Sequence, residues 1–192
     1  MNSKIVARYG IIVALIICAY YVDVLISWGI SMIVPTPIRI AVTSLIVVLT
    51  ICQLFDFKTA VFATTVFGVS SFLFAYIHPN LTASFFQNPL VSIFPRIMID
   101  IVSYSVYFAI NKVFQNKNVF LRDYATRSIA GAAGIITNTL LVITMMQLVK
   151  TDGDVFGTLL QVLIGIFFII ELCAGLLVVP VVSKTVKERI NI

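Results

Sequence analysis

Long apolar segments, each close to the thickness of a lipid bilayer, constrain the fold of this chain more than any other feature. A helix needs about 20 mostly apolar residues to cross the hydrocarbon core. Hydrophobic residues make up 60% of the 192 residues and charged residues 11%, whereas a soluble domain has roughly 45–50% and 25%. We therefore predict an all-α integral membrane protein, with residues 1–192 forming a single domain of six transmembrane helices. The six segments run from about Ile5 to Trp28, Ile38 to Phe55, Thr59 to Ile77, Pro95 to Phe114, Ala125 to Val149 and Val155 to Val182.

The basic residues are distributed unevenly between the two sides of such a bundle. Cytoplasmic loops of membrane proteins carry the excess of Lys and Arg, so we predict that both termini are cytoplasmic and that His78 to Phe94 is the longest outer loop. Only three basic residues fall on the outer side: Arg39, Arg96 and Lys150. The other ten fall on the inner side: Lys4, Arg8, Lys58, Lys112, Lys117, Arg122, Arg127, Lys184, Lys187 and Arg189.

Several classes of function lack the residues that they require. No clustered basic face indicates nucleic-acid binding, and the sequence contains no GxxxxGK[ST] motif to hold nucleotide phosphates. His78 is the only histidine and the three cysteines are far apart, so we expect no bound metal or other cofactor. Asp23 and Glu171 are scattered acidic candidates without a catalytic arrangement. A membrane-embedded enzyme, a passive channel and an assembly factor without a ligand remain as alternatives to a binding or transport subunit.

The fourth apolar segment has a polar face. Arg96, Asp100, Ser103, Tyr104 and Tyr107 follow one another at i, i+4, i+7, i+8 and i+11, which is one side of a helix. Polar groups are costly in lipid, so this face should point into the bundle or into a water-filled cavity. Two readings stay open: Arg96 pairs with Asp100, or Arg96 presents its donors to an anionic ligand.

Further candidate contacts for a ligand lie around this polar face. Asn88 precedes the fourth segment and would line the loop above Arg96. Asn138 lies about 15 Å into the fifth segment, counted from Ser128, and either makes an interhelical hydrogen bond or contacts the ligand. Gln161, in the outer half of the sixth segment, is a similar case. We therefore predict a substrate-binding set that consists of Asn88, Arg96, Tyr104, Asn138 and Gln161.

Small residues repeat every four positions in the first apolar segment. Gly10, Ala14 and Cys18 form a stripe over about two turns. Small residues allow helices to approach closely in membranes, where packing drives helix association. The stripe therefore packs within the bundle or forms a docking face for another membrane protein.

Two motifs together resemble a known family. They are Asn88-Pro89-Leu90-Val91-Ser92-Ile93-Phe94-Pro95-Arg96, and Gly131 and Gly134 followed by Thr137-Asn138-Thr139. With six predicted helices and about 190 residues, the chain resembles the substrate-binding S components of energy-coupling factor (ECF) vitamin transporters along its whole length. The resemblance implies a bundle in the bacterial cell membrane that captures a vitamin near its outer face. It also implies partners, namely a transmembrane T component and two ATPase subunits that hydrolyse ATP, so that this chain is not itself an enzyme.

The resemblance extends to the docking stripe and narrows the substrate. S components of the family dock on the T component through alanines spaced four apart, and here Gly10 and Cys18 replace two of them. The one arginine on the polar face, Arg96, suits a small vitamin with one carboxylate, and pantothenate fits this description. Folate, riboflavin and the other vitamins or precursors of the family are the alternatives.

Overall fold

The computed structural model describes residues 3–33, 41–78, 83–115, 119–149 and 166–190, and in this part of the chain every regular element is a helix. The long helices are α1 (Ser3–Ile33), α3 (Phe57–Ile77), α6 (Phe94–Val113) and α7 (Val119–Leu148). The chain ends with α9 (Ile166–Cys173), the π-helix η1 (Ala174–Val178) and α10 (Val179–Ile190). Five helical segments are long and apolar enough to cross a membrane. The prediction of an all-α, multi-pass membrane protein is confirmed, while six crossings remains a prediction.

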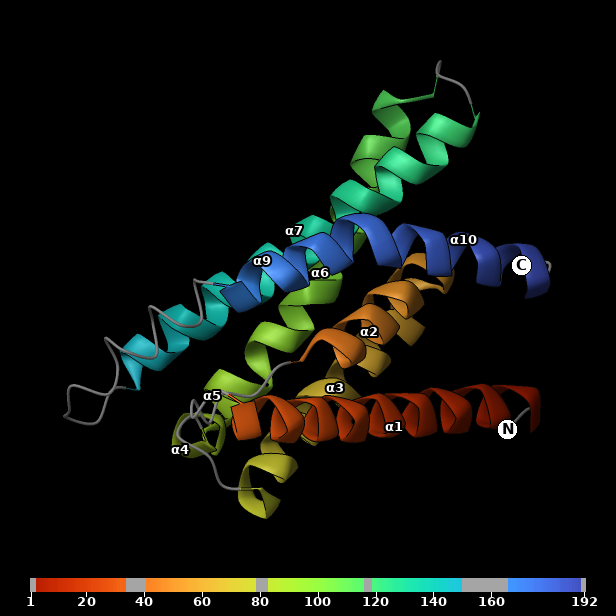
Figure 1. The fold of residues 1–192 in the computed structure, drawn as a ribbon. Coiled ribbons are helices and arrows are strands. Elements are labelled where there is room, and N and C mark those ends of the chain that lie inside the picture. The colour runs from red at the N-terminus through yellow and green to blue at the C-terminus, as the bar shows by residue number, and fades with distance from the viewer. Residues whose placement is uncertain (1–2, 34–40, 79–82, 116–118, 150–165, 191–192) are drawn as a thin grey trace.

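The second helix, α2 (Val42–Leu54), is shorter than the predicted segment but lies at the centre of the bundle. It packs against α1, α3, α6, α7, η1 and α10, and Figure 1 shows it enclosed by the longer helices. Leu45, Val48 and Leu49 are almost completely buried on it. Together with Ile16 of α1 and Phe67 of α3 they form the main apolar core. The position of α2 therefore determines how the surrounding helices can pack.

The chain reverses between α2 and α3 through a short polar turn. Asp56 is the N-cap of α3, and its side chain accepts hydrogen bonds from the backbone N–H and the hydroxyl of Thr59. These bonds, mainly that from the Thr59 hydroxyl, lower the pKa of the Asp56 carboxyl below its ordinary value of 3.8. The cap is therefore intact at neutral pH, and its contribution to stability is lost only as the pH falls through this lowered pKa.

Two features of the fold differ from the sequence prediction. The predicted outer loop from His78 to Phe94 contains two one-turn helices, α4 (Ala83–Phe86) and α5 (Pro89–Ser92). A single turn has too few residues for a periodic pattern, so the sequence does not reveal such helices. The last helical segment also continues past Val182 to the end of α10. As a result, α1 begins and α10 ends at the same end of the bundle, opposite α4 and α5 (Figure 1).

The π-helix η1 lies just before Pro180 and against α7. Proline cannot donate a hydrogen bond to the carbonyl four residues earlier, which here is that of Leu176. The Ser128 hydroxyl of α7 donates to this carbonyl at 2.9 Å. Gly131 and Gly175 let the two backbones meet, since a Cβ on Gly131 would lie 2.6 Å from the Gly175 carbonyl oxygen. The Leu176 carbonyl, which Pro180 deprives of its usual donor, thus receives a hydrogen bond from the neighbouring helix α7.

Replacement of Gly131 by alanine tests this close approach. The added methyl group overlaps the backbone of η1, so we expect Gly131→Ala to lower the free energy of unfolding by about 1–3 kcal/mol. Gly10→Ala is the matched control, because a Cβ there meets nothing within 4 Å. It should raise stability by up to about 1 kcal/mol through helix propensity. Thermal unfolding of both variants in the same detergent makes the comparison, and equal stability of the two would contradict the packing described.

Candidate functional site

The amino-terminal end of the central helix α2 is capped by a residue from another helix. The carboxylate of Asp23, on α1, accepts hydrogen bonds from the backbone N–H groups of Thr43 at 2.8 Å and Ser44 at 2.9 Å. It also accepts one from the Ser44 hydroxyl. Asp23 is only 2% exposed. The first N–H groups of a helix have no partner within the helix, and the positive end of its dipole favours a carboxylate. Asp23 therefore supplies the cap that α2 lacks locally.

Arg96 lies in the first turn of α6 and is buried, at 5% exposed. Its guanidinium donates to the Val91 carbonyl at 3.0 Å and lies over the rings of Phe86 and Phe67, at 5.0 Å and 5.7 Å from their centroids. Gly68 allows α3 to lie this close to the start of α6, because a Cβ on Gly68 would lie 3.0 Å from the Cα atom of Ile93. The arginine is thus held in place by aromatic and backbone contacts.

Glu171 of α9 brings a second acidic side chain to this end of the bundle. Its carboxylate lies within electrostatic range of both Arg96 and Asp23, and close to the backbone N–H of Ala41. It therefore joins the guanidinium of α6 to the capped end of α2. The charge of Arg96 is partly balanced from inside the protein.

Asn138 of α7 lies at the level of Arg96. Helices α6 and α7 run antiparallel and share the most extensive packing in the fold. Ser103 of α6 donates to the Ala130 carbonyl of α7. Beyond the start of α6, Val91 of α5 and Val142 of α7 belong to one apolar cluster. Asn138 is buried, and its Oδ1 atom receives no hydrogen bond within the described residues. An amide oxygen buried in this way can accept a hydrogen bond from a ligand.

Asp100 lies one turn after Arg96 on α6 and is completely buried. Neither of its carboxylate oxygens receives a hydrogen bond within the described part of the chain. The Cys52 thiol lies beside it, outside hydrogen-bonding geometry. The alternative reading of an Arg96–Asp100 ion pair is therefore wrong. The expectation that the polar face of α6 points into the bundle is confirmed for Arg96, Asp100 and Ser103, whereas Tyr104 and Tyr107 are only half-buried.

These side chains define a polar cluster of Asp23, Arg96, Asp100, Asn138 and Glu171. Its members come from α1, α6, α7 and α9. Glu171 lies within electrostatic range of Arg96 and Asp23, whereas Asp100 lies beside Cys52, further along α2 from its capped end. Three carboxyl groups stand against one guanidinium. Buried ionisable groups in membrane helices are costly and mark functional sites more often than structural ones. The arrangement can bind a small polar molecule through charge and hydrogen bonds. Its three carboxyl groups do not come together as metal ligands, since no group of three or more His, Cys, Asp or Glu side chains in the described residues could hold a metal ion.

The other predicted site residues lie elsewhere. Asn88 caps α5, where its side chain accepts from the Leu90 N–H at 3.0 Å. Tyr104 is half-buried two turns from Arg96, and its ring packs edge-to-face against that of Phe57 at the start of α3, with 5.4 Å between the ring centroids. Gln161 lies outside the described residues. The structure therefore places Arg96 and Asn138 at the same level of two adjacent helices, while neither Asn88 nor Tyr104 has a described interaction with the polar cluster.

The predicted docking stripe is on the surface of the bundle. Gly10, Ala14 and Cys18 are all exposed on α1. The exposed stripe is available to another membrane protein, and the residues of α1 that pack against the core, such as Ile12 and Ile16, lie on a different face.

Sequence reasoning missed the roles of two acidic residues in the site. Asp23 and Glu171 interrupt apolar segments, and this is visible in the sequence. Their partners, Ser44 and Arg96, are 21 and 75 positions away in sequence, and no local pattern connects positions so far apart. The interruption of an apolar segment by an acid is therefore the signal that could have identified them.

No protein-family model matches this chain, and comparison with curated proteins finds no significant match.

Two aspartate caps allow a matched test of the buried one. We expect Asp23→Ala to destabilise the protein by about 2–4 kcal/mol, because it removes charge-assisted hydrogen bonds and leaves buried N–H groups of α2 without a partner. Asp56→Ala removes an exposed cap and should cost about 0.5–2 kcal/mol. Chemical or thermal unfolding in detergent measures both variants. A smaller loss for Asp23→Ala than for Asp56→Ala would show that α2 does not depend on its cap.

Proposed function

We propose that this protein is the substrate-binding subunit of a membrane importer, an S component of the ECF type that captures a small vitamin. The observation that supports it most strongly is the polar cluster, a set of charged and amide groups in the interior of a bundle of apolar helices. An interior set of charged and amide groups has a high cost in a membrane unless it serves a ligand or a transport path. In this proposal both termini are cytoplasmic, the ligand enters from outside, and the partner ATPases supply the energy.

The ligand proposed from the sequence is pantothenate, whose single carboxylate would meet Arg96. The Asp100 carboxyl and the Asn138 Oδ1 atom receive no hydrogen bond from the described residues. These two groups favour a second candidate. They suit a ligand with N–H or cationic groups, because each can accept a hydrogen bond. Thiamine, which carries a positive charge and an amino group, is the vitamin of the family that fits them best.

The proposed partners are a transmembrane T component and two ATPase subunits. The exposed stripe of Gly10, Ala14 and Cys18 supports a docking role, since small residues on the surface of a helix allow a partner helix to approach closely. The apolar residues that flank the stripe, such as Val6 and Ile17, are also exposed. They would add apolar contact area around it.

The ligand proposal predicts the effect of removing the arginine. If Arg96 donates charge-assisted hydrogen bonds to a carboxylate, Arg96→Gln should weaken pantothenate binding about tenfold to a hundredfold. Isothermal titration of the purified protein measures this, with thiamine, folate, riboflavin and biotin titrated in parallel. Tight thiamine binding that survives Arg96→Gln and is lost in Asp100→Asn would select the second candidate.

A paired variant separates binding from folding. Arg96→Gln alone leaves the partly buried Glu171 without the nearby positive charge, whereas Arg96→Gln combined with Glu171→Gln removes both charges and should recover stability. Binding per folded molecule should stay weak in the double variant. If the double variant bound pantothenate as tightly as the unaltered protein, Arg96 would have only a structural role.

The stripe on α1 gives a separate test of the partner proposal. We expect Ala14→Trp to keep ligand affinity unchanged, because residue 14 is exposed, and to prevent assembly with the T component and ATPases. Co-purification after co-expression measures assembly, and vesicle uptake measures transport. Normal assembly and uptake by Ala14→Trp would remove the stripe from the interface, and a loss of ligand binding would place it in the core.

A further inference from the structure

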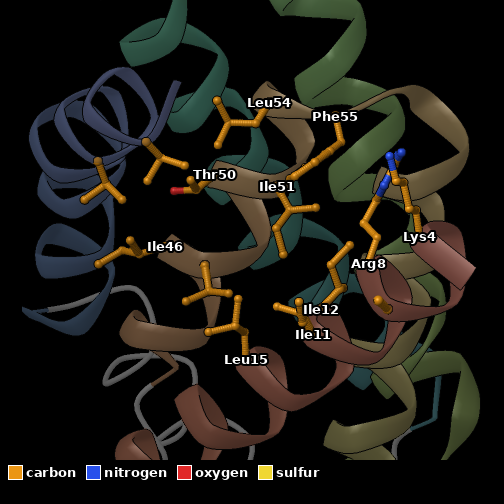
Figure 2. A pocket seen from close by; sticks show the side chains of 14 residues that line it. Lys4, Arg8, Ile11, Ile12, Leu15, Ile46, Thr50, Ile51, Leu54 and Phe55 are labelled. Atoms are coloured by element: carbon orange, nitrogen blue, oxygen red, sulfur yellow. The ribbon is translucent and has the colours of Figure 1, made fainter. Parts of the chain in front are cut away.

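An apolar groove lies between the amino-terminal half of α1, α2 and α10. Its volume is about 590 Å³. Aliphatic side chains make up most of its walls, among them Ile11, Leu15, Ile46 and Val182 (Figure 2). The walls begin in the first turns of α1 and continue into its apolar part. The groove therefore lies where the hydrocarbon region of one membrane leaflet would begin.

Two basic side chains stand at the mouth of the groove. Lys4 and Arg8 extend from α1 one helical turn apart, and both line the groove (Figure 2). Arg8 also contacts Asp56 at 3.5 Å, but both side chains of this pair are largely exposed. An exposed ion pair is weak, so Arg8 can exchange it for another anion. The mouth thus has a net positive charge directly above an apolar wall.

A hydroxyl group inside the groove has no partner in the described part of the chain. Thr50 of α2 is 7% exposed and lines the groove, yet its Oγ1 atom makes no hydrogen bond within these residues. A threonine in a helix ordinarily donates to a backbone carbonyl of its own helix, as Thr64 and Thr65 of α3 do. Thr50 lies about 6 Å along the helix from Leu54, which marks the level of the mouth. The Thr50 hydroxyl therefore lies deeper in the groove than the two basic groups.

We propose that this groove binds one anionic phospholipid of the surrounding leaflet. The phosphate lies between Lys4 and Arg8, an ester carbonyl accepts a hydrogen bond from Thr50, and an acyl chain follows the aliphatic walls toward Ile46. Basic residues at the membrane edge attract anionic lipids. The order of charge, then hydroxyl, then hydrocarbon matches the order of groups in a phospholipid.

The size of the groove favours a lipid over a partner helix or a second copy of this chain. A helix with its side chains is about 10 Å across and 5.4 Å per turn, so each turn occupies roughly 400 Å³. The groove therefore holds little more than one turn of a helix. A phospholipid acyl chain is narrow enough to lie along it.

Native mass spectrometry of the full chain tests the proposal without any vitamin or transport partner, so its result is independent of the proposed function. The delipidated protein is mixed with equal amounts of phosphatidylglycerol and phosphatidylcholine that carry identical acyl chains. We expect preferential retention of phosphatidylglycerol. Combined Lys4→Gln and Arg8→Gln substitution should reduce this retention about fivefold for each charge removed. Lys112→Gln with Arg122→Gln is the matched control, since it removes two basic groups that do not line the groove.

Two further variants separate lipid binding from the other occupants. Thr50→Val keeps the shape of the side chain and should weaken both lipids about two- to tenfold. Ala7→Trp fills the groove and should displace the lipid, whereas Ala14→Trp on the neighbouring stripe should not. Equal retention of the two lipids, unaffected by the Lys4 and Arg8 substitutions, would overturn the proposal. A dimer mass that Ala7→Trp abolishes, with lipid retention unchanged, would assign the groove to a second copy of the chain.

Discussion

The capping of α2 by Asp23 is the interaction on which the rest of the bundle depends. A membrane interior offers no water to the free N–H groups at a helix end, so the protein must satisfy them itself. Because α2 is the short central helix that packs on six neighbouring elements, its position affects most of the interior. Asp23 ties the start of α2 to α1, and Glu171 brings the last helical segment to the same point. These polar contacts thus bring α1, α2 and α9 together at the start of α2.

The same requirement for internal partners explains the irregular part of the last helical segment. Pro180 removes the donor for the Leu176 carbonyl, and Ser128 of α7 replaces it. Gly131 and Gly175 bring the backbones close enough for this exchange. The distortion is tolerated because it is buried against a neighbouring helix, as broken helices in membranes require.

The sequence predicts the features that follow from local periodicity. The long apolar segments and the inward face of Arg96, Asp100 and Ser103 were predicted, because hydrophobicity and helical spacing determine both. The short helices α4 and α5 were not, since one turn carries no period. The contacts of Asp23 with Ser44 and of Glu171 with Arg96 depend on tertiary packing. For this reason only part of the polar cluster was predicted, namely Arg96, Asp100 and Asn138, and the contacts of Asp23 and Glu171 emerge from the fold.

The central claim is that the polar cluster holds a small vitamin, and the most direct test is to identify what the purified protein carries. The full chain, purified in mild detergent from its native membrane, is denatured, and the released small molecules are identified by mass spectrometry. The account predicts one vitamin or vitamin precursor in near-equimolar amount, strongly reduced in the double variant of Arg96→Gln with Glu171→Gln. No released vitamin, together with no saturable binding of any vitamin added afterwards, would contradict it.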